Sequence, residues 1–112
     1  MTAGNAPLRT IVVEDEPLVR LMTEDVLTSI GCVIVASAST LNEALACIPA
    51  TELDLAVLDV NLGGTEVYPA AELLRSRGTP IVFVIATSAT AITVRGATAG
   101  GAVPALVASV PV

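Results

Sequence analysis

Four short apolar runs alternate with segments of helical periodicity, and this alternation constrains the fold more than any other feature of the chain. The runs span residues 9–13, 32–36, 53–58 and 80–86. Apolar, β-branched runs of this length are typical of strands buried on both faces, and helices between them imply parallel strands joined by right-handed crossovers. The sequence therefore predicts an α/β fold built on a doubly wound parallel sheet.

Proline, glycine and capping residues mark the helix termini. Pro17 suits a first helical turn, and Gly31 suits a helix end. Thr40 and Glu43 form a capping box. The predicted helices span residues 17–30, 40–49 and 68–77. In the first helix, apolar residues recur at three- and four-residue steps, at Leu18, Val19, Met22, Val26 and Ile30.

The last part of the chain differs in composition from the rest. All acidic residues lie within residues 14–72, whereas residues 87–112 carry one charge, Arg95. Poor helix formers make residues 89–99 a weak helix whose alternation also fits a strand. Residues 104–109 are predicted to form a fifth strand, and no residues then remain to build a final helix.

The 112 residues predict one domain, 1–112, in which residues 8–88 are well patterned and residues 89–112 are atypical. The formal net charge of -6 and the absence of lysine and histidine argue against binding to nucleic acid or to anionic membranes, because phosphate contacts need clustered cations. No apolar run reaches the length of a membrane span, and the first residues lack a signal pattern, so we expect a cytoplasmic protein. Cys32 and Cys47 are predicted to be inert thiols.

Acidic residues follow two of the predicted strands. Asp59 ends the third run, ahead of a loop at Gly63-Gly64. Glu14 and Asp15 follow the first run. A strand-ending aspartate alone is often only a turn residue. In doubly wound sheets, however, function collects at the carboxyl ends of the strands, so neighbouring first and third strands would bring the three carboxylates into one pocket.

Three neighbouring carboxylates repel one another, so either some keep their protons or a hard divalent cation neutralises them. Mg²⁺ or Mn²⁺ suits such ligands, and the backbone carbonyl of Asn61 is a further candidate ligand. A carboxylate beside such an ion can attack a phosphorus centre to give an acyl phosphate. A hydroxyl at Thr87 can then hydrogen-bond a phosphoryl oxygen, although this Thr- and Ser-rich segment supplies a hydroxyl by composition alone.

Residues 11–19, residues 55–64 and the strand end at Thr87 occur together in this order. The set resembles the receiver domain of two-component response regulators, and the match covers roughly residues 9–88. Residues 66–71 and 83–87 also resemble a group of small single-domain receivers in proteobacteria. The resemblance implies a flavodoxin-like fold with five parallel strands in the order 2-1-3-4-5, here lacking or altering the last helix.

The resemblance also implies a role for each candidate site residue. Glu14 and Asp15 would bind the metal together with Asp59, which would be the phosphoacceptor. Asn61 would offer its backbone carbonyl to the metal, and Thr87 would contact the phosphoryl group. The donor would be a phosphohistidine on a sensor histidine kinase or phosphotransfer protein. The chain would then be a stand-alone signalling domain rather than an enzyme.

Two positions depart from the receiver pattern. Receivers carry a lysine in a Lys-Pro pair at the end of the fifth strand, where this chain has Val110-Pro111. They also carry an aromatic residue in that strand, where residues 106–108 contain no ring. Metal and aspartate carry the phosphotransfer chemistry, so these losses bear on whether phosphorylation is coupled to a surface change.

Three alternatives remain open. Without a last helix, an apolar sheet face would be exposed, so the chain could be a degenerate receiver that works independently of phosphorylation as an interaction module and homodimer. An aspartate-nucleophile phosphatase would need a carboxylate two residues after the nucleophile, where Asn61 stands. The residues after Ser88 could also be truncated or read out of frame in a GC-rich gene, which the nucleotide sequence would show.

Overall fold

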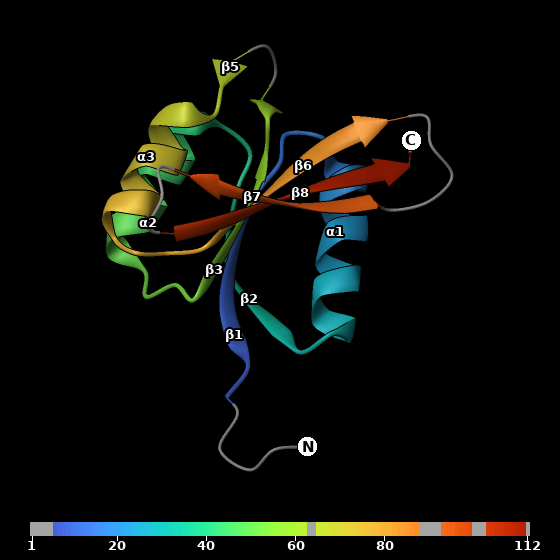
Figure 1. Cartoon of the computed structure of the whole chain (residues 1–112), viewed down its shortest axis with the longest axis horizontal. Coiled ribbons are helices and arrows are strands. Elements are labelled where there is room, and N and C mark those ends of the chain that lie inside the picture. The colour runs from blue at the N-terminus through green and yellow to red at the C-terminus, as the bar shows by residue number, and fades with distance from the viewer. Residues whose placement is uncertain (1–5, 63–64, 88–92, 100–102, 112) are drawn as a thin grey trace.

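The computed structural model describes residues 6–62, 65–87, 93–99 and 103–111 (Figure 1). At residues 61, 65, 85–87, 93–99 and 103–111 the description covers the backbone alone. In chain order the elements are β1 (Leu8–Val13), α1 (Pro17–Ser29), β2 (Cys32–Ala38), α2 (Leu41–Ala50), β3 (Leu55–Asp59), β4 (Asn61–Leu62), β5 (Thr65–Glu66), α3 (Tyr68–Ser76), β6 (Ile81–Thr87), β7 (Thr93–Ala99) and β8 (Val103–Pro111).

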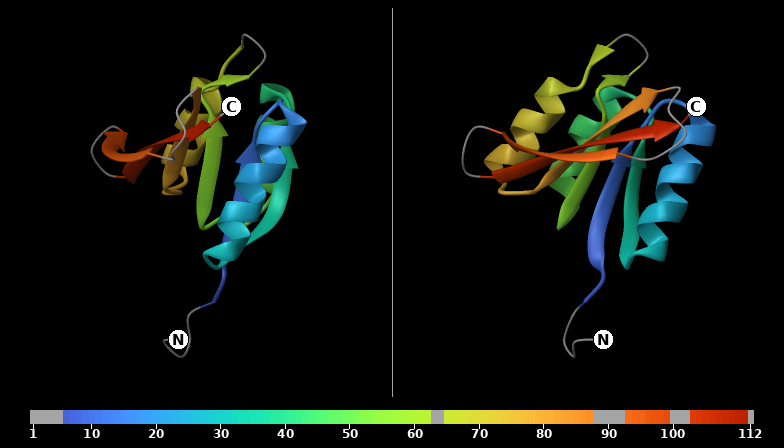
Figure 2. Two further views of the ribbon diagram at one scale, coloured as in Figure 1. Left: turned by 90° about the vertical axis from the view of Figure 1, so that its right-hand side faces the viewer. Right: turned by 45° about the vertical axis from the view of Figure 1, so that its right-hand side comes forward.

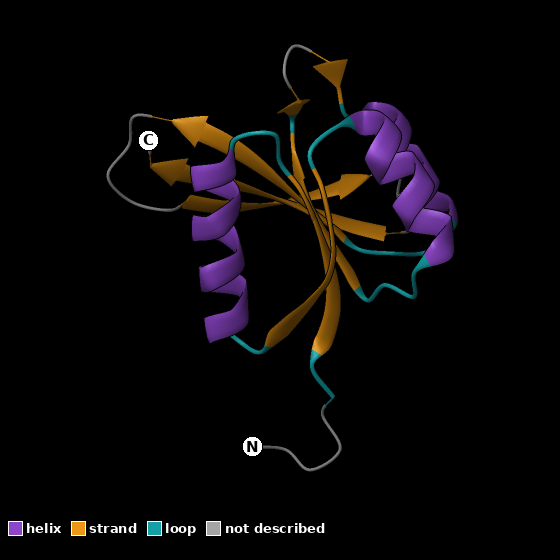
Figure 3. Cartoon of the chain, turned by 180° about the vertical axis from the view of Figure 1, so that it is seen from behind, coloured by secondary structure: helices purple, strands orange, loops and turns teal. Residues whose placement is uncertain are grey.

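Six strands form the main sheet, in the order β2-β1-β3-β6-β8-β7. The first five are joined by parallel pairing, which confirms the predicted order, with β6 and β8 as the fourth and fifth strands. Helices α2 and α3 cover one face, and α1 covers the other (Figures 1 and 3). Figure 2 shows the twist of the sheet from β2 and β1 to β8 and β7. This is a flavodoxin-like, doubly wound arrangement.

The prediction of a weak helix over residues 89–99 was wrong, because strand β7 occupies residues 93–99. Residues 93–99 pair antiparallel with β8, and residues 89–92 lie outside the described part of the chain. The segment contains β-branched residues and Gly96, which are poor helix formers, so pairing along β8 outweighs helix formation. No described residue after β6 is helical, in agreement with a missing or altered last helix.

The predicted helix starts are confirmed. Helix α1 begins at Pro17. The Thr40 hydroxyl accepts a hydrogen bond from the Glu43 N–H at 3.1 Å, and the Glu43 carboxylate accepts one from the Ser39 N–H at 2.7 Å. Pro49, expected at the end of the second helix, lies inside the last turn of α2, where its missing N–H removes only one terminal hydrogen bond.

The sheet separates two hydrophobic clusters of unequal size. The larger lies on the side of α2 and α3 and includes Ile48 and Leu74. The smaller contains Leu27 of α1. The apolar periodicity of α1 predicts the helix correctly but not its buried residue, because Leu18 and Ile30 are 68% and 70% exposed. They are exposed because no helix of the described residues lies beside α1 on this face (Figure 3).

Strand β2 has one residue more than its pairing with β1 requires. Thr10 and Ile11 are consecutive in β1, but they pair with Ile34 and Ala36, which leaves Val35 between the two pairs. As a result, Ile34 packs against the smaller cluster, whereas Ala36 packs against the larger one. One strand therefore contributes to both clusters.

Candidate functional site

The candidate site forms where β1 and β3 end side by side. Val13 of β1 pairs with Leu58 of β3, and Glu14 and Asp59 each come one residue later. The Glu14 N–H donates to the Ala38 carbonyl of β2 at 2.9 Å, so backbone hydrogen bonding continues past the end of β1. The sheet thus holds the backbone from which the acidic side chains project.

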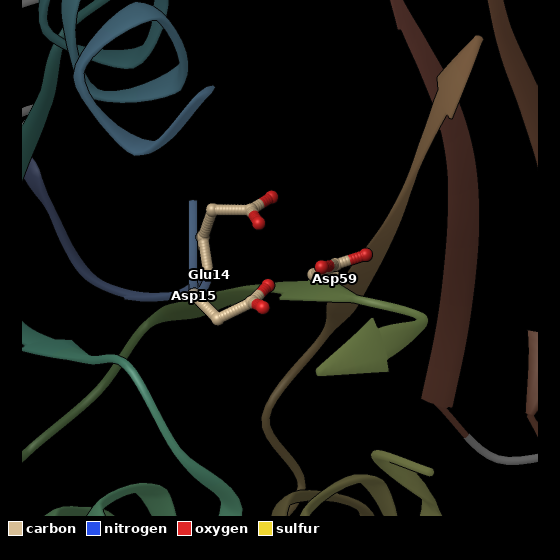
Figure 4. Close-up of side chains that lie close together, drawn as sticks. All are labelled: Glu14, Asp15 and Asp59. Atoms are coloured by element: carbon tan, nitrogen blue, oxygen red, sulfur yellow. The ribbon is translucent and has the colours of Figure 1, made fainter. Parts of the chain in front are cut away.

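The carboxyl groups of Glu14, Asp15 and Asp59 lie close together (Figure 4). One carboxylate oxygen from each residue lies within 4.8 Å of those of the other two. Glu14 is only 4% exposed, whereas Asp15 and Asp59 are half-buried. The structure therefore brings together the three acids that the sequence places at neighbouring strand ends. We call these three residues the acidic cluster.

Burial raises the pKa of the Glu14 carboxyl from an ordinary value of 4.5 to about 8. The Glu16 N–H donates to Glu14 Oε2 at 3.2 Å, and this contact lowers the pKa. Asp59, through a hydrogen bond and its charge, and Asp15, through a hydrogen bond, raise it. Without a cation in the cluster, Glu14 therefore retains its proton near neutral pH.

The donor set of the acidic cluster fits a hard divalent cation. Mg²⁺ and Mn²⁺ prefer carboxylate oxygens, and Mg²⁺ is commonly held by a few carboxylates with water completing its coordination. Oxygens within 4.8 Å of one another are close enough to serve one ion. A cation among them would also offset the charge of Asp59, which adds to burial in raising the Glu14 pKa.

Asn61 lies two residues after Asp59, at the start of β4. Strand β4 pairs with β5 through Asn61 and Glu66, in a small antiparallel hairpin that the sequence analysis missed. Two glycines between short extended segments are a known hairpin signal, which could have revealed it. Residues Gly63-Gly64 themselves lie outside the described residues, and metal binding by the Asn61 carbonyl stays a prediction.

Thr87 ends β6, at the same rim of the sheet as the acidic cluster. It lies three residues beyond Val84, which pairs with Asp59. Its own partner on β8 is Pro111. The Thr87 side chain lies outside the described residues, so the phosphoryl contact assigned to its hydroxyl stays a prediction.

A second group of charged residues lies at the amino ends of β1 and β3. Arg9 Nε donates to Asp54 Oδ2 at 3.0 Å, and Arg9 Nη1 donates to Glu52 Oε2 at 2.7 Å. The hydrogen bond from the Arg9 side chain lowers the pKa of Asp54. We call Arg9, Glu52 and Asp54 the ion-paired cluster. It joins the starts of two strands.

The two cysteines lie outside the acidic cluster. Cys32 is buried, Cys47 is half-buried, and both are free thiols. Neither belongs to the acidic cluster.

Within the described residues, no helix is both long enough and apolar enough to cross a membrane.

Comparison with protein families gives a match over most of the chain. Residues 10–106 match the response regulator receiver domain. The matched span begins in β1 and ends within β8, and it includes the whole acidic cluster.

Individual relatives agree with this match. The transcriptional regulatory protein YvrH of Bacillus subtilis (strain 168) is 33% identical over 91 residues, which cover 80% of this chain and 38% of YvrH. SdrG from Sphingomonas melonis Fr1 is 40% identical, with a TM-score of 0.68 over 75% of this chain and 72% of SdrG. The BeF3-activated conformation of SdrG from Pseudomonas melonis Fr1 is 38% identical, with a TM-score of 0.61 over 77% of this chain and 73% of SdrG. The chain thus spans well under half of the curated relative YvrH.

Proposed function

The chain belongs to the receiver domain family of two-component response regulators, and on that premise we propose that it accepts a phosphoryl group on Asp59 from a sensor histidine kinase or a phosphotransfer protein. The observation that carries this proposal is the convergence of the Glu14, Asp15 and Asp59 carboxyl oxygens within 4.8 Å. BeF3 has the shape and charge of a phosphoryl group, so the BeF3-activated conformation of SdrG supports the proposal by analogy.

Asp59 supplies the nucleophile. A carboxylate oxygen of Asp59 attacks the phosphorus of the donor phosphohistidine, and an O–P bond forms as the P–N bond breaks. The electron pair of the broken bond returns to the imidazole nitrogen of the donor. The products are an acyl phosphate on Asp59 and a free histidine on the donor.

Glu14 and Asp15 hold a divalent cation next to Asp59 in this proposal. A bound Mg²⁺ or Mn²⁺ ion would offset the negative charge of the transferred phosphoryl group. Because the Glu14 pKa is raised to about 8, its carboxyl must lose a proton to become a ligand, so cation binding depends on pH. The Asn61 carbonyl and the Thr87 hydroxyl complete the proposed site, as ligand and phosphoryl contact respectively.

The proposed chemistry ends with phosphoryl acceptance. The chain has no lysine, and the end of β8 carries Val110-Pro111 in place of the Lys-Pro pair of receivers. Residues 106–108 also lack the aromatic residue that receivers carry in this strand.

The exposed apolar residues of α1 favour a second candidate function. Leu18, Leu21 and Val26 are exposed on this helix, and so is Ile30, which directly follows it. An exposed apolar patch is commonly covered by a partner or a second copy, so the chain would act as a homodimer and interaction module independent of phosphorylation. A strictly monomeric mass in light scattering at high concentration would count against it. We further propose a cytoplasmic protein, and its net charge of -6 and lack of lysine favour a chain that binds neither nucleic acid nor anionic membrane.

Phosphorylation by acetyl phosphate or a cognate kinase in the presence of Mg²⁺ tests the first function. Intact-mass spectrometry should show one added phosphoryl group on the wild type and none on Asp59→Asn. Asp54→Asn is the matched control, because Asp54 precedes the same strand at its opposite end and pairs with Arg9. It should be labelled like the wild type. Persistent labelling of Asp59→Asn would refute the proposed function.

A further inference from the structure

A closed ring of hydrogen bonds surrounds the turn that follows β1. The Glu14 N–H donates to the Ala38 carbonyl at 2.9 Å. The Glu16 N–H donates to Glu14 Oε2 at 3.2 Å, and the Glu16 carbonyl accepts from the Arg20 N–H at 2.9 Å. Arg20 Nη1 donates to Ser39 Oγ at 3.1 Å, and Ser39 follows Ala38 in the chain, which closes the ring.

The contact between Arg20 and Ser39 is the side-chain link that joins two elements in this ring. These residues are 19 positions apart, and the contact connects α1 to the turn between β2 and α2. Ser39 is held in turn by its N–H, which donates to the Glu43 carboxylate at 2.7 Å. The contact is partly buried and its donor is charged, so it contributes more than an exposed neutral hydrogen bond.

A similar contact lies one helical turn further along α1. Ser37 Oγ donates to Glu24 Oε2 at 2.8 Å, and it also joins α1 to β2. This contact is exposed, and neither residue is part of the ring around Glu14. The chain thus contains a matched control for the contact between Arg20 and Ser39.

We propose that Arg20, acting through Ser39, is a positioning residue for the acidic cluster. This inference rests on the proposed function, because it concerns cation binding by Glu14 and Asp15. Arg20 holds the turn after β2 against α1, and that turn directly follows Ala38, the last residue of β2, whose carbonyl accepts from the Glu14 N–H. The backbone of Glu14 and Asp15 is thereby ordered before a cation arrives, so less order must be created on binding.

Mg²⁺ titration of the full chain by isothermal calorimetry tests this inference. Arg20→Ala and Ser39→Ala should each weaken Mg²⁺ binding about fivefold. The double variant should be no weaker than either single variant, because both remove the same contact. Ser37→Ala should bind Mg²⁺ like the wild type. Arg20→Lys should recover most of the affinity, because an ammonium group can also donate to Ser39 Oγ.

A measurement without metal separates positioning from general destabilisation. Amide hydrogen exchange at Glu14 should become about fivefold faster in Arg20→Ala and stay unchanged in Ser37→Ala. The melting temperatures of the two variants should fall by similar small amounts. Wild-type Mg²⁺ affinity in Arg20→Ala would overturn the inference, and so would an equal loss of affinity in Ser37→Ala.

Failure of the proposed function has a different signature. A wild-type protein that binds Mg²⁺ but is not phosphorylated would refute phosphoryl acceptance, and the variants would still decide the role of Arg20. A wild-type protein that binds no Mg²⁺ would refute both, and Arg20 would then be a structural contact only.

Discussion

Carboxyl groups lie at both ends of strands β1 and β3, but their pKa values are shifted in opposite directions. At the amino ends, Arg9 donates hydrogen bonds to Asp54 and Glu52, and the pKa of Asp54 is lowered. At the carboxyl ends, Glu14 lies against the carboxyls of the acidic cluster, and its pKa is raised to about 8. The ion-paired cluster already contains a positive charge, the Arg9 guanidinium, whereas the acidic cluster would be stabilised by the cation that we propose it binds. This difference separates a structural contact from a candidate site.

The largest expected effect is on cation affinity. Asp15→Asn removes one charged ligand of the acidic cluster and should weaken Mg²⁺ binding at least about a hundredfold. Asp54→Asn removes the same charge from the ion-paired cluster and should leave the affinity unchanged. Calorimetric titration of both variants gives the comparison. Equal losses of Mg²⁺ affinity in the two variants would contradict cation binding at the acidic cluster.

Cation binding should also stabilise the fold. At a Mg²⁺ concentration about one hundred times the dissociation constant, the free energy of unfolding should rise by about 2.7 kcal/mol. The increase should largely disappear in Asp59→Asn, which removes a ligand charge. Thermal unfolding with and without Mg²⁺ measures the difference. Equal stabilisation of Asp59→Asn would place the bound ion outside the acidic cluster.

The stability of the metal-free protein should fall as the pH rises from about 4.5 to about 8. The folded pKa of Glu14 lies above its unfolded value, so the folded state binds an extra proton within this window and loses stability as that proton is released. We expect a change of a few kcal/mol in the free energy of unfolding, measured by urea denaturation at about pH 4.5 and at about pH 8. Glu14→Gln should flatten the profile, and an unaltered profile in that variant would exclude Glu14 as its source.

The smallest expected effect concerns the ion-paired cluster. Arg9→Gln should lower the melting temperature only slightly, because exposed ion pairs contribute little in water. The lowered pKa of Asp54 means that this contribution is present above the ordinary pKa of an aspartate and is lost as the pH falls. Melting curves at neutral and acidic pH measure it. A large fall in the melting temperature of Arg9→Gln at neutral pH would contradict a small contribution from these ion pairs.

The parallel strands themselves could be predicted because buried strands have a uniform apolar composition, and their order is what the resemblance to receiver domains implies. Residues 9–13 and 53–58 overlap β1 and β3, and flanking proline and glycine residues separate them from the helices. The convergence of Glu14 and Asp59 then follows from topology, since residues that end neighbouring parallel strands meet at one rim. Local sequence thus located the strands and the acids at their ends, and the resemblance supplied the strand order that makes the two strand ends neighbours.

Other features depend on contacts between distant parts of the chain. Helix α1 has apolar residues on several sides, so its periodicity does not reveal that Leu27 is the buried one. Strand β7 forms by pairing with β8, a partner that local helix propensity does not consider. The hydrogen bond between Arg20 and Ser39 likewise exists only after α1 has packed against β2. These features required the structure.

The extra residue in β2 affects which changes of chain length the protein can tolerate. Deleting one residue from a buried strand normally turns the remaining side chains to the wrong face. Here Ile34 and Ala36 already pair with consecutive residues of β1, so a chain without Val35 would keep both pairs in a regular strand. Both hydrophobic clusters would keep their contributions from β2. A one-residue deletion, usually tolerated only in loops, should therefore be tolerated at Val35 of this sheet.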